Sequence, residues 1–207
     1  MNEKIICAIT DFIANRSSKT LDGNSKHKDL IREYKKGADD YEILKYGVAV
    51  IYYNFTKTAV LVVAAAVLGI LPHALAFMLV FGSLRRFARG LHLKNNVLCT
   101  IIGFANYIAG IYAALNVTMG LVPSIVIYLA CMLLNLIYTP SPTENKPIKK
   151  QDRLPLKIKT MLVMAALFVL LLVIGGNAFR NIIVIATTIE TMYILPFTYK
   201  IFKEKRS

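Results

Sequence analysis

Long apolar runs, separated by basic segments, are the feature of this sequence that most limits how the chain can fold. Hydrophobic residues make up 56% of its 207 residues, and the mean hydropathy is +0.53. The interior of a soluble domain of this length is too small for so much apolar side chain. Runs of about 18 or more apolar residues are typical of helices that cross a bilayer. We therefore predict an all-α fold, a polytopic membrane helix bundle.

About six membrane segments are predicted, and proline, glycine and asparagine residues separate them. The second segment is too short to cross a full bilayer without tilting, because a helix rises only roughly 1.5 Å per residue. It either extends into the arginine-rich stretch that follows it or lies where the protein thins the membrane. The predicted segments cover residues 47–71, 74–84, 97–115, 121–138, 158–174 and 182–197.

Positive charge indicates how these segments are oriented. The chain has 25 Lys and Arg residues, and its formal net charge is +13. All of the basic residues except Lys57 and Arg180 fall in four clusters, at 1–45, 85–94, 146–159 and 200–206. Six membrane segments place these clusters on one side of the membrane. The positive-inside rule puts that side in the cytoplasm, with the lipid bilayer as a partner. Because the charge follows membrane topology, we do not expect nucleic acid as a partner. The cytoplasmic parts are residues 1–45, 85–96, 139–157 and 199–207.

The N-terminal region is predicted to be cytoplasmic or interfacial, and its apolar pieces are too short for a cleavable signal peptide. Ile5, Ile9, Phe12 and Ile13 share one helix face, which suits a helix that lies on a membrane surface. The predicted regions are the amphipathic residues 1–45, a single transmembrane domain at 46–199 and a tail at 200–207.

Three cysteines, Cys7, Cys99 and Cys131, show neither the spacing of a disulfide framework nor that of a metal site. We expect no metal and no cofactor. Each cysteine is then either a small buried apolar residue or a reactive thiol. Cys131 lies deep in an apolar run, where packing is the expected role.

His92 and Cys99 could form a pair of base and nucleophile, in which the imidazole removes the thiol proton. Seven residues of continuous helix would rise roughly 10.5 Å, too far for a hydrogen bond, so the pair requires a bend. Asn96 is a suitable N-cap for a helix that starts at Val97, which would place Cys99 in the first turn. The helix N-terminus and the nearby basic residues would stabilise a thiolate. The alternative is that the histidine is solvated or caps a helix and the cysteine packs.

The stretch LRRFARGLHLKNNVLCT resembles the accessory gene regulator B family of membrane cysteine peptidases, which process quorum-sensing propeptides in Gram-positive bacteria. Arg85, Gly90, His92 and Cys99 fall on positions of the family's motif. Arg89 departs from it, because the family often has a second glycine there. The loop YTPSPTENKPIKK, the length and the hydropathy pattern are also similar to the family's.

The resemblance implies a bacterial cell-membrane cysteine endopeptidase that removes the charged C-terminal tail of a short propeptide with an amphipathic helix. Cys99 would attack a backbone carbonyl, with His92 as general base and then as general acid. An internal cysteine or serine of the peptide would then attack the thioester acyl-enzyme and close a thiolactone or lactone ring. The resemblance also implies a homodimer.

A basic cytoplasmic surface would attract an acidic peptide tail. The same charges also satisfy membrane topology without any substrate. Gly90 either allows a peptide backbone to approach closely or ends a helix. The candidates for substrate binding are Arg85, Arg86, Arg89, Gly90, Lys149 and Lys150.

Glu190 lies in the middle of the sixth apolar run, where an ionisable side chain is costly. It could orient His92, bind an arginine of another helix or pair with Lys57, and a structural pair between helices is the plainer reading. A transporter or export component for a peptide or small molecule is the main alternative function, with Glu190 and Lys57 along its path. A membrane scaffold without catalytic activity is the third hypothesis, and it would tolerate the loss of both His92 and Cys99.

Overall fold

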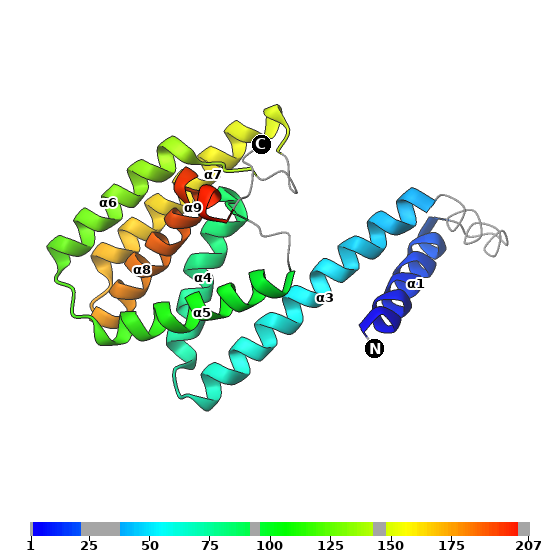
Figure 1. Ribbon diagram of the computed structural model, residues 1–207, viewed down its shortest axis with the longest axis horizontal. Coiled ribbons are helices and arrows are strands. Elements are labelled where there is room, and N and C mark those ends of the chain that lie inside the picture. The colour runs from blue at the N-terminus through cyan, green and yellow to red at the C-terminus, as the bar shows by residue number, and fades with distance from the viewer. Residues whose placement is uncertain (1, 22–37, 92–95, 143–147, 203–207) are drawn as a thin grey trace. The chain divides into compact units, whose positions relative to one another are not determined.

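Helices make up almost all of the computed structural model, which describes residues 2–21, 38–91, 96–142 and 148–202. Among these residues no strand forms, which confirms the predicted all-α fold. The helices are α1 (Asn2–Leu21), α3 (Ala38–Val67), α4 (Leu71–Ala88), α5 (Asn96–Asn116), α6 (Leu121–Tyr138), α7 (Lys150–Val173), α8 (Asn177–Ile194) and α9 (Pro196–Ile201) (Figure 1).

The chain divides into two compact units, residues 1–61 and residues 62–207. In the first unit, the hydroxyl of Tyr41 in α3 donates a hydrogen bond to Asp11 Oδ1 of α1 at 3.0 Å. Ile6 of α1 is buried, whereas the apolar face predicted for this helix is exposed. An exposed apolar helix face of this kind suits a membrane surface. The exposed residues of that face are Ile5, Ile9, Phe12 and Ile13.

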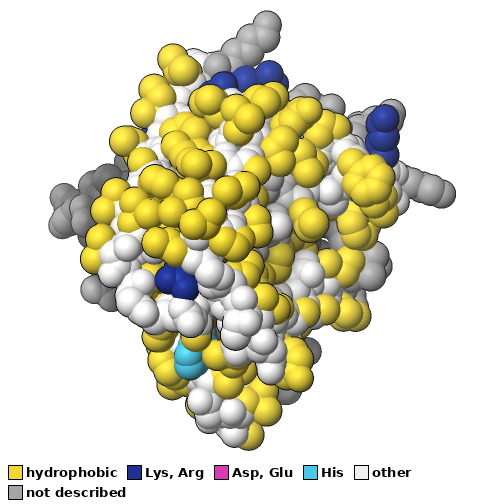
Figure 2. Space-filling view, turned by 90° about the vertical axis from the view of Figure 1, so that its left-hand side faces the viewer, with side chains coloured by type: hydrophobic (Ala, Val, Ile, Leu, Met, Phe, Trp, Pro, Cys, Tyr) yellow, Lys and Arg dark blue, Asp and Glu magenta, His cyan; other side chains and the backbone are white. Residues whose placement is uncertain are grey.

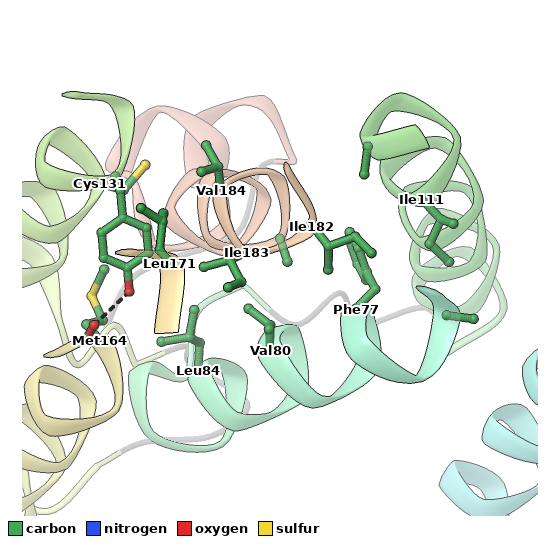
Figure 3. Packing of buried hydrophobic residues seen from close by; sticks show 14 of the residues in the cluster. Phe77, Val80, Leu84, Ile111, Cys131, Met164, Leu171, Ile182, Ile183 and Val184 are labelled. Atoms are coloured by element: carbon green, nitrogen blue, oxygen red, sulfur yellow. Dashed lines mark hydrogen bonds between the residues drawn. The ribbon is translucent and has the colours of Figure 1, made fainter. Parts of the chain in front are cut away.

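The central helix of the second unit is α8, against which α4, α5 and α6 all pack. Ile182 and Ile183 of α8 are fully or almost fully buried, and they lie against Phe77, Val80 and Leu84 of α4 (Figure 3). The helix α7 packs against both α4 and α6. Because other helices surround α8, its polar side chains reach partners on those helices rather than solvent.

Two predicted helix starts, those of the second and the fifth segment, are wrong because prolines lie inside the helices instead of before them. Pro72 stands in the first turn of α4, where its missing N–H has no helical partner to lose. The second segment therefore starts at Leu71 instead of residue 74. It ends at Ala88, so it extends into the arginine-rich stretch, which is the first of the two alternatives for this short segment. Pro155 lies inside α7, so residues 150–157 of the predicted basic loop are helical.

The sixth predicted segment, residues 182–197, is interrupted near its end. The helix α8 ends at Ile194, and Leu195 has φ −69° and ψ 139°, an extended backbone. A residue that precedes proline avoids the helical region, and Pro196 follows directly. The short helix α9 then begins at Pro196 and carries Tyr199, whose side chain is buried.

Three helices of the described residues are long and apolar enough to cross a membrane, and they lie at 41–67, 121–138 and 151–173. A shorter apolar helix covers residues 100–116. The other two predicted segments also form helices, but α4 carries two arginines, and α8 carries Arg180 and Glu190. One face of the molecule is covered mostly by hydrophobic side chains, as a bilayer contact requires (Figure 2).

Candidate functional site

The predicted His92 and Cys99 pair marks the site, but the structure describes only part of it. His92 lies outside the described residues, as does Lys94. The backbone of Cys99 lies in the first turn of α5, as predicted, and α5 begins at Asn96 itself rather than at Val97. The structure does describe the segment that leads to His92 and the helices that hold this segment.

The segment before His92 is buried and sharply turned. Ala88 and Leu91 have at most 1% of their surface exposed, and Gly90 is also buried. Arg89 has φ 67° and Gly90 has φ 95°, so two successive residues have left-handed backbone. A glycine with positive φ just after a helix is the usual way to end it. The structure thus supports the second of the two roles considered for Gly90.

Backbone hydrogen bonds tie this segment to two distant parts of the chain. The N–H of Gly90 donates to the carbonyl of Ser141 at 3.0 Å, and the N–H of Ser141 donates to the carbonyl of Ala88 at 3.1 Å. The N–H of Leu91 donates to the carbonyl of Tyr193 at 3.0 Å. The end of α4, the residues after α6 and the end of α8 therefore meet directly before His92.

Ser141 is the residue at which these three parts join. Its side chain is fully buried, and its Oγ donates to the carbonyl of Ile194 at 3.0 Å. Its own carbonyl also accepts from the hydroxyl of Tyr199 in α9 at 3.2 Å. The sequence alone does not single out Ser141, because a serine between two prolines indicates only a turn.

Gly90 is required by the space around it as well as by its backbone. A Cβ at this position would lie 2.8 Å from Arg85 Nη1 and 3.1 Å from the carbonyl oxygen of Tyr193. Real Cβ atoms do not approach other heavy atoms at 2.8 Å, so any side chain would displace the guanidinium. The glycine therefore lets Arg85 and α8 lie directly against the segment that leads to His92.

Arg85 points into the bundle and has three partners. Its Nη1 lies 3.6 Å from Glu190 Oε2, and only 19% of its side chain and 1% of that of Glu190 are exposed. Its guanidinium carbon lies 4.8 Å from the centre of the Tyr193 ring, a cation–π contact. Its Nη2 donates a hydrogen bond to the carbonyl of Leu91. Of the partners considered for Glu190, the structure shows the arginine of another helix.

The other basic candidates are placed differently. Arg86 and Arg89 are exposed at the end of α4, and Lys149 is exposed directly before α7. Lys150 is the first residue of α7, and its side chain is not described. Arg86 and Arg89 thus remain candidates to bind an acidic peptide, whereas Arg85 is already paired within the bundle.

A buried polar contact between α6 and α8 lies close to the same junction. Asn135 donates to Thr191 Oγ1 at 2.8 Å, and Thr139 Oγ1 donates to Asn135 Oδ1 at 3.2 Å. Cys131 is buried, with its Sγ 3.6 Å from Thr188 Oγ1, in agreement with the predicted packing role. Within the described residues, no three His, Cys, Asp or Glu side chains gather as metal ligands would.

Comparison with known proteins places these features in a family. The model of the family described as accessory gene regulator B (AgrB) matches residues 17–194. An AgrB-like protein of Clostridium acetobutylicum is 29% identical over 161 residues, which cover 76% of each chain. The accessory gene regulator protein B of Staphylococcus haemolyticus is 26% identical over 185 residues, which cover 87% of this chain and 97% of the relative.

No solved structure matches the chain. The family match includes the junction before His92 and the start of α5, and the apolar helices agree with a membrane protein. The chain therefore belongs to the accessory gene regulator B family of membrane proteins.

Proposed function

We propose that the protein is an integral membrane cysteine endopeptidase that removes the C-terminal tail of a short autoinducer propeptide and supports its cyclisation for quorum sensing. The observation that carries this proposal is the junction before His92. Leu91 has both of its backbone groups bound, the N–H by Tyr193 and the carbonyl by Arg85. A fixed backbone directly before the base in sequence, and a cysteine in the first turn of the next helix, suit nucleophilic catalysis.

The reaction needs two steps at the sulfur of Cys99. In the first, the thiolate forms a bond to the scissile carbonyl carbon, and the C–N bond breaks. The electron pair stays on the amine of the tail, which takes a proton from His92. In the second, His92 removes the proton of an internal thiol or hydroxyl of the peptide. That group attacks the thioester, and Cys99 leaves as a thiolate, so that a thiolactone or lactone ring closes.

The substrate follows from the charge of the surface near the site. Arg86 and Arg89 are exposed directly after the buried Arg85, on the end of α4 that leads to His92. Exposed cations at this place would attract an acidic tail and bring the bond before it to the site. This role requires the end of α4 to face the cytoplasm, which is the orientation that the positive-inside rule predicts.

The transporter hypothesis has less support from the contacts. It relied on two charges within the apolar runs, Glu190 and Lys57. Glu190 is paired with Arg85 of another helix and has at most 1% of its side chain exposed. A carboxylate that is buried and paired with another helix in this way is not free to line a path for a substrate.

The first test needs no substrate. Inside-out vesicles carry the protein with Cys7→Ser and Cys131→Ser, and alkylation of Cys99 is followed against pH with and without His92→Ala. Serine at position 131 keeps a hydroxyl near Thr188 Oγ1, which lies 3.6 Å from the sulfur of Cys131. We expect alkylation to report a thiol pKa below that of an ordinary cysteine, and we expect the His92 variant to lose that shift.

The second test measures the reaction itself. A short peptide with an amphipathic helix and an acidic tail is added to the protein in liposomes, and the released tail is quantified by mass spectrometry. We expect Cys99→Ala and His92→Ala to abolish release, while the Cys7→Ser, Cys131→Ser protein retains it. Tail release by Cys99→Ala at the unmodified rate would rule out the endopeptidase.

A further inference from the structure

Glu190 is a buried carboxylate for which helix packing alone gives no reason. Its side chain is 1% exposed, and within the described residues neither of its oxygens has a hydrogen-bond partner. Its ion-pair partner there is Arg85, at 3.6 Å. A buried ion pair can often be replaced by apolar side chains of similar volume without loss of stability. The pair therefore calls for a role other than stability.

A short chain of contacts leads from Glu190 to the residue before His92. Glu190 holds Arg85 Nη1, and Arg85 Nη2 donates to the carbonyl of Leu91. The centre of the Tyr193 ring lies 4.8 Å from the guanidinium carbon, a cation–π contact. Gly90 makes room for the guanidinium, because a Cβ at position 90 would lie 2.8 Å from Arg85 Nη1.

The guanidinium is thus aimed by three groups at one backbone carbonyl. The N–H of the same residue, Leu91, is bound by the carbonyl of Tyr193, one turn of α8 after Glu190. A single stretch of α8 therefore determines both hydrogen bonds of Leu91: the N–H directly, and the carbonyl through Arg85. The residue that follows on this fixed backbone is His92.

We propose that Glu190 is a positioning residue, which acts through Arg85 and the carbonyl of Leu91 to hold the backbone that carries His92. The inference rests on the proposed function, since it assigns a role relative to the base of that reaction. Without the carboxylate, the guanidinium loses its partner in the bundle and swings away from Leu91. Leu91, the residue before His92, then keeps one of its two backbone hydrogen bonds.

The test compares Glu190→Gln with a matched variant, Thr187→Val. Thr187 lies on α8 one turn before Glu190 and is fully buried, and its Oγ1 has no hydrogen-bond partner among the described residues. Glu190→Gln removes a buried carboxylate and Thr187→Val removes a buried hydroxyl from the same helix, and both nearly keep the side-chain volume. Tail release is measured in liposomes as kcat and KM, and alkylation of Cys99 is followed against pH in the protein with Cys7→Ser and Cys131→Ser.

We expect Glu190→Gln to lower kcat by about 10- to 100-fold, because small misplacements of a catalytic group have effects of this size. KM should change little, since Glu190 does not touch the peptide. The alkylation profile should move toward that of His92→Ala, and Glu190→Asp should recover part of kcat. Thr187→Val should leave both readouts unchanged.

A double variant separates positioning from folding. Arg85→Gln together with Glu190→Gln leaves no unpaired charge in the bundle, so the double variant should fold even where a single one does not. If Glu190 acts through Arg85, the double variant has the low kcat of Arg85→Gln, and the two losses do not multiply. Recovery of full kcat by the double variant would mean that the pair has a purely structural role and would overturn the inference.

The same measurements keep the two proposals apart. Tail release that survives Cys99→Ala defeats the proposed function, whatever Glu190 does. Release that requires Cys99 and His92 but is unchanged in Glu190→Gln defeats the positioning role alone. Losses from Arg85→Gln and Glu190→Gln that multiply would also defeat it, because the two residues would then act independently.

Discussion

The two ends of the second unit are built from the same helices, but they are closed in different ways. At one end, side chains of α8 bind backbone carbonyls where α5 stops. Asn181 donates to the carbonyls of Ala114 and Val117, and Arg180 Nη2 donates to that of Met119 at 3.2 Å. These bonds satisfy carbonyl groups that every helix end leaves without partners.

At the other end, the bonds hold the sharply turned segment that follows α4. Backbone groups of residues 88–91 pair with Ser141 and Tyr193, and the buried pair of Arg85 and Glu190 lies directly beneath them. Arg89 adopts a left-handed backbone, which is unfavourable for a side chain larger than glycine. The features that cost stability therefore gather at the end that leads to His92, as at many functional sites.

Among the variants that test this difference between the two ends, Gly90→Ala should have the largest effect on the reaction. The added Cβ would lie 2.8 Å from Arg85 Nη1 and 3.1 Å from the carbonyl oxygen of Tyr193, at a φ of 95°. We expect tail release and alkylation of Cys99 to fall by about 100-fold, because the segment before His92 must shift. Gly175→Ala is the control from the other end, where a Cβ would meet nothing within 4 Å. Equal losses in both variants would contradict the contrast.

Asn181→Ala should damage the opposite end without touching the reaction. The side chain is 1% exposed and donates to the carbonyl of Ala114 at 3.1 Å, which the variant would leave buried without this donor. We expect a loss of about 1–3 kcal/mol in the free energy of unfolding, measured in detergent. The folded fraction should release the tail at the original rate. A fall in kcat as large as that of Gly90→Ala would show that the two ends are not independent.

The helices of this chain could be predicted from the sequence, because long apolar runs admit few other structures in a membrane. Their ends could not be predicted as well. From the sequence, Pro72 and Pro155 predict breaks, yet proline is tolerated in the first turn of a helix and, at a cost, further along. Pro196 does end a helix, since Leu195 before it turns to an extended backbone.

The site was only partly visible in the sequence for a different reason. Spacing along one helix or turn can suggest His92 and Cys99, and depth in an apolar run can single out Glu190. Which partner Glu190 has depends on how α4 and α8 pack, and no local pattern contains this information. Ser141 is still harder to find, because its role comes from backbone groups that any residue possesses.

Ser141→Ala should have a moderate effect on stability and kcat, and it tests the end of the unit that leads to His92. The variant loses the hydrogen bond from Oγ to the carbonyl of Ile194 at 3.0 Å but keeps the backbone bonds to Ala88 and Gly90. We expect about 1 kcal/mol of destabilisation and a fall of a few-fold in kcat. Ser124→Ala is the matched control, since Ser124 is buried in the first turn of α6 and donates to the carbonyl of Gly120 at 2.9 Å. The control should lose similar stability with no change in kcat, and a fall of kcat in both would argue against a special role for Ser141.

Arg86→Gln should have the smallest effect, and it tests the surface of the site rather than its interior. The side chain is exposed, so its attraction to an acidic tail is worth about 0.2–1 kcal/mol, which corresponds to a rise in KM of at most about five-fold. Because no bond of the buried junction changes, kcat should stay the same, and the rise in KM should fade as salt is added. Arg153→Gln removes a charge that is also exposed, from α7, and serves as the control. If both variants raise KM alike, the tail senses only the net charge of that side of the protein. If Arg86→Gln alone raises it, the peptide tail lies along the end of α4, next to the segment that α8 holds in place.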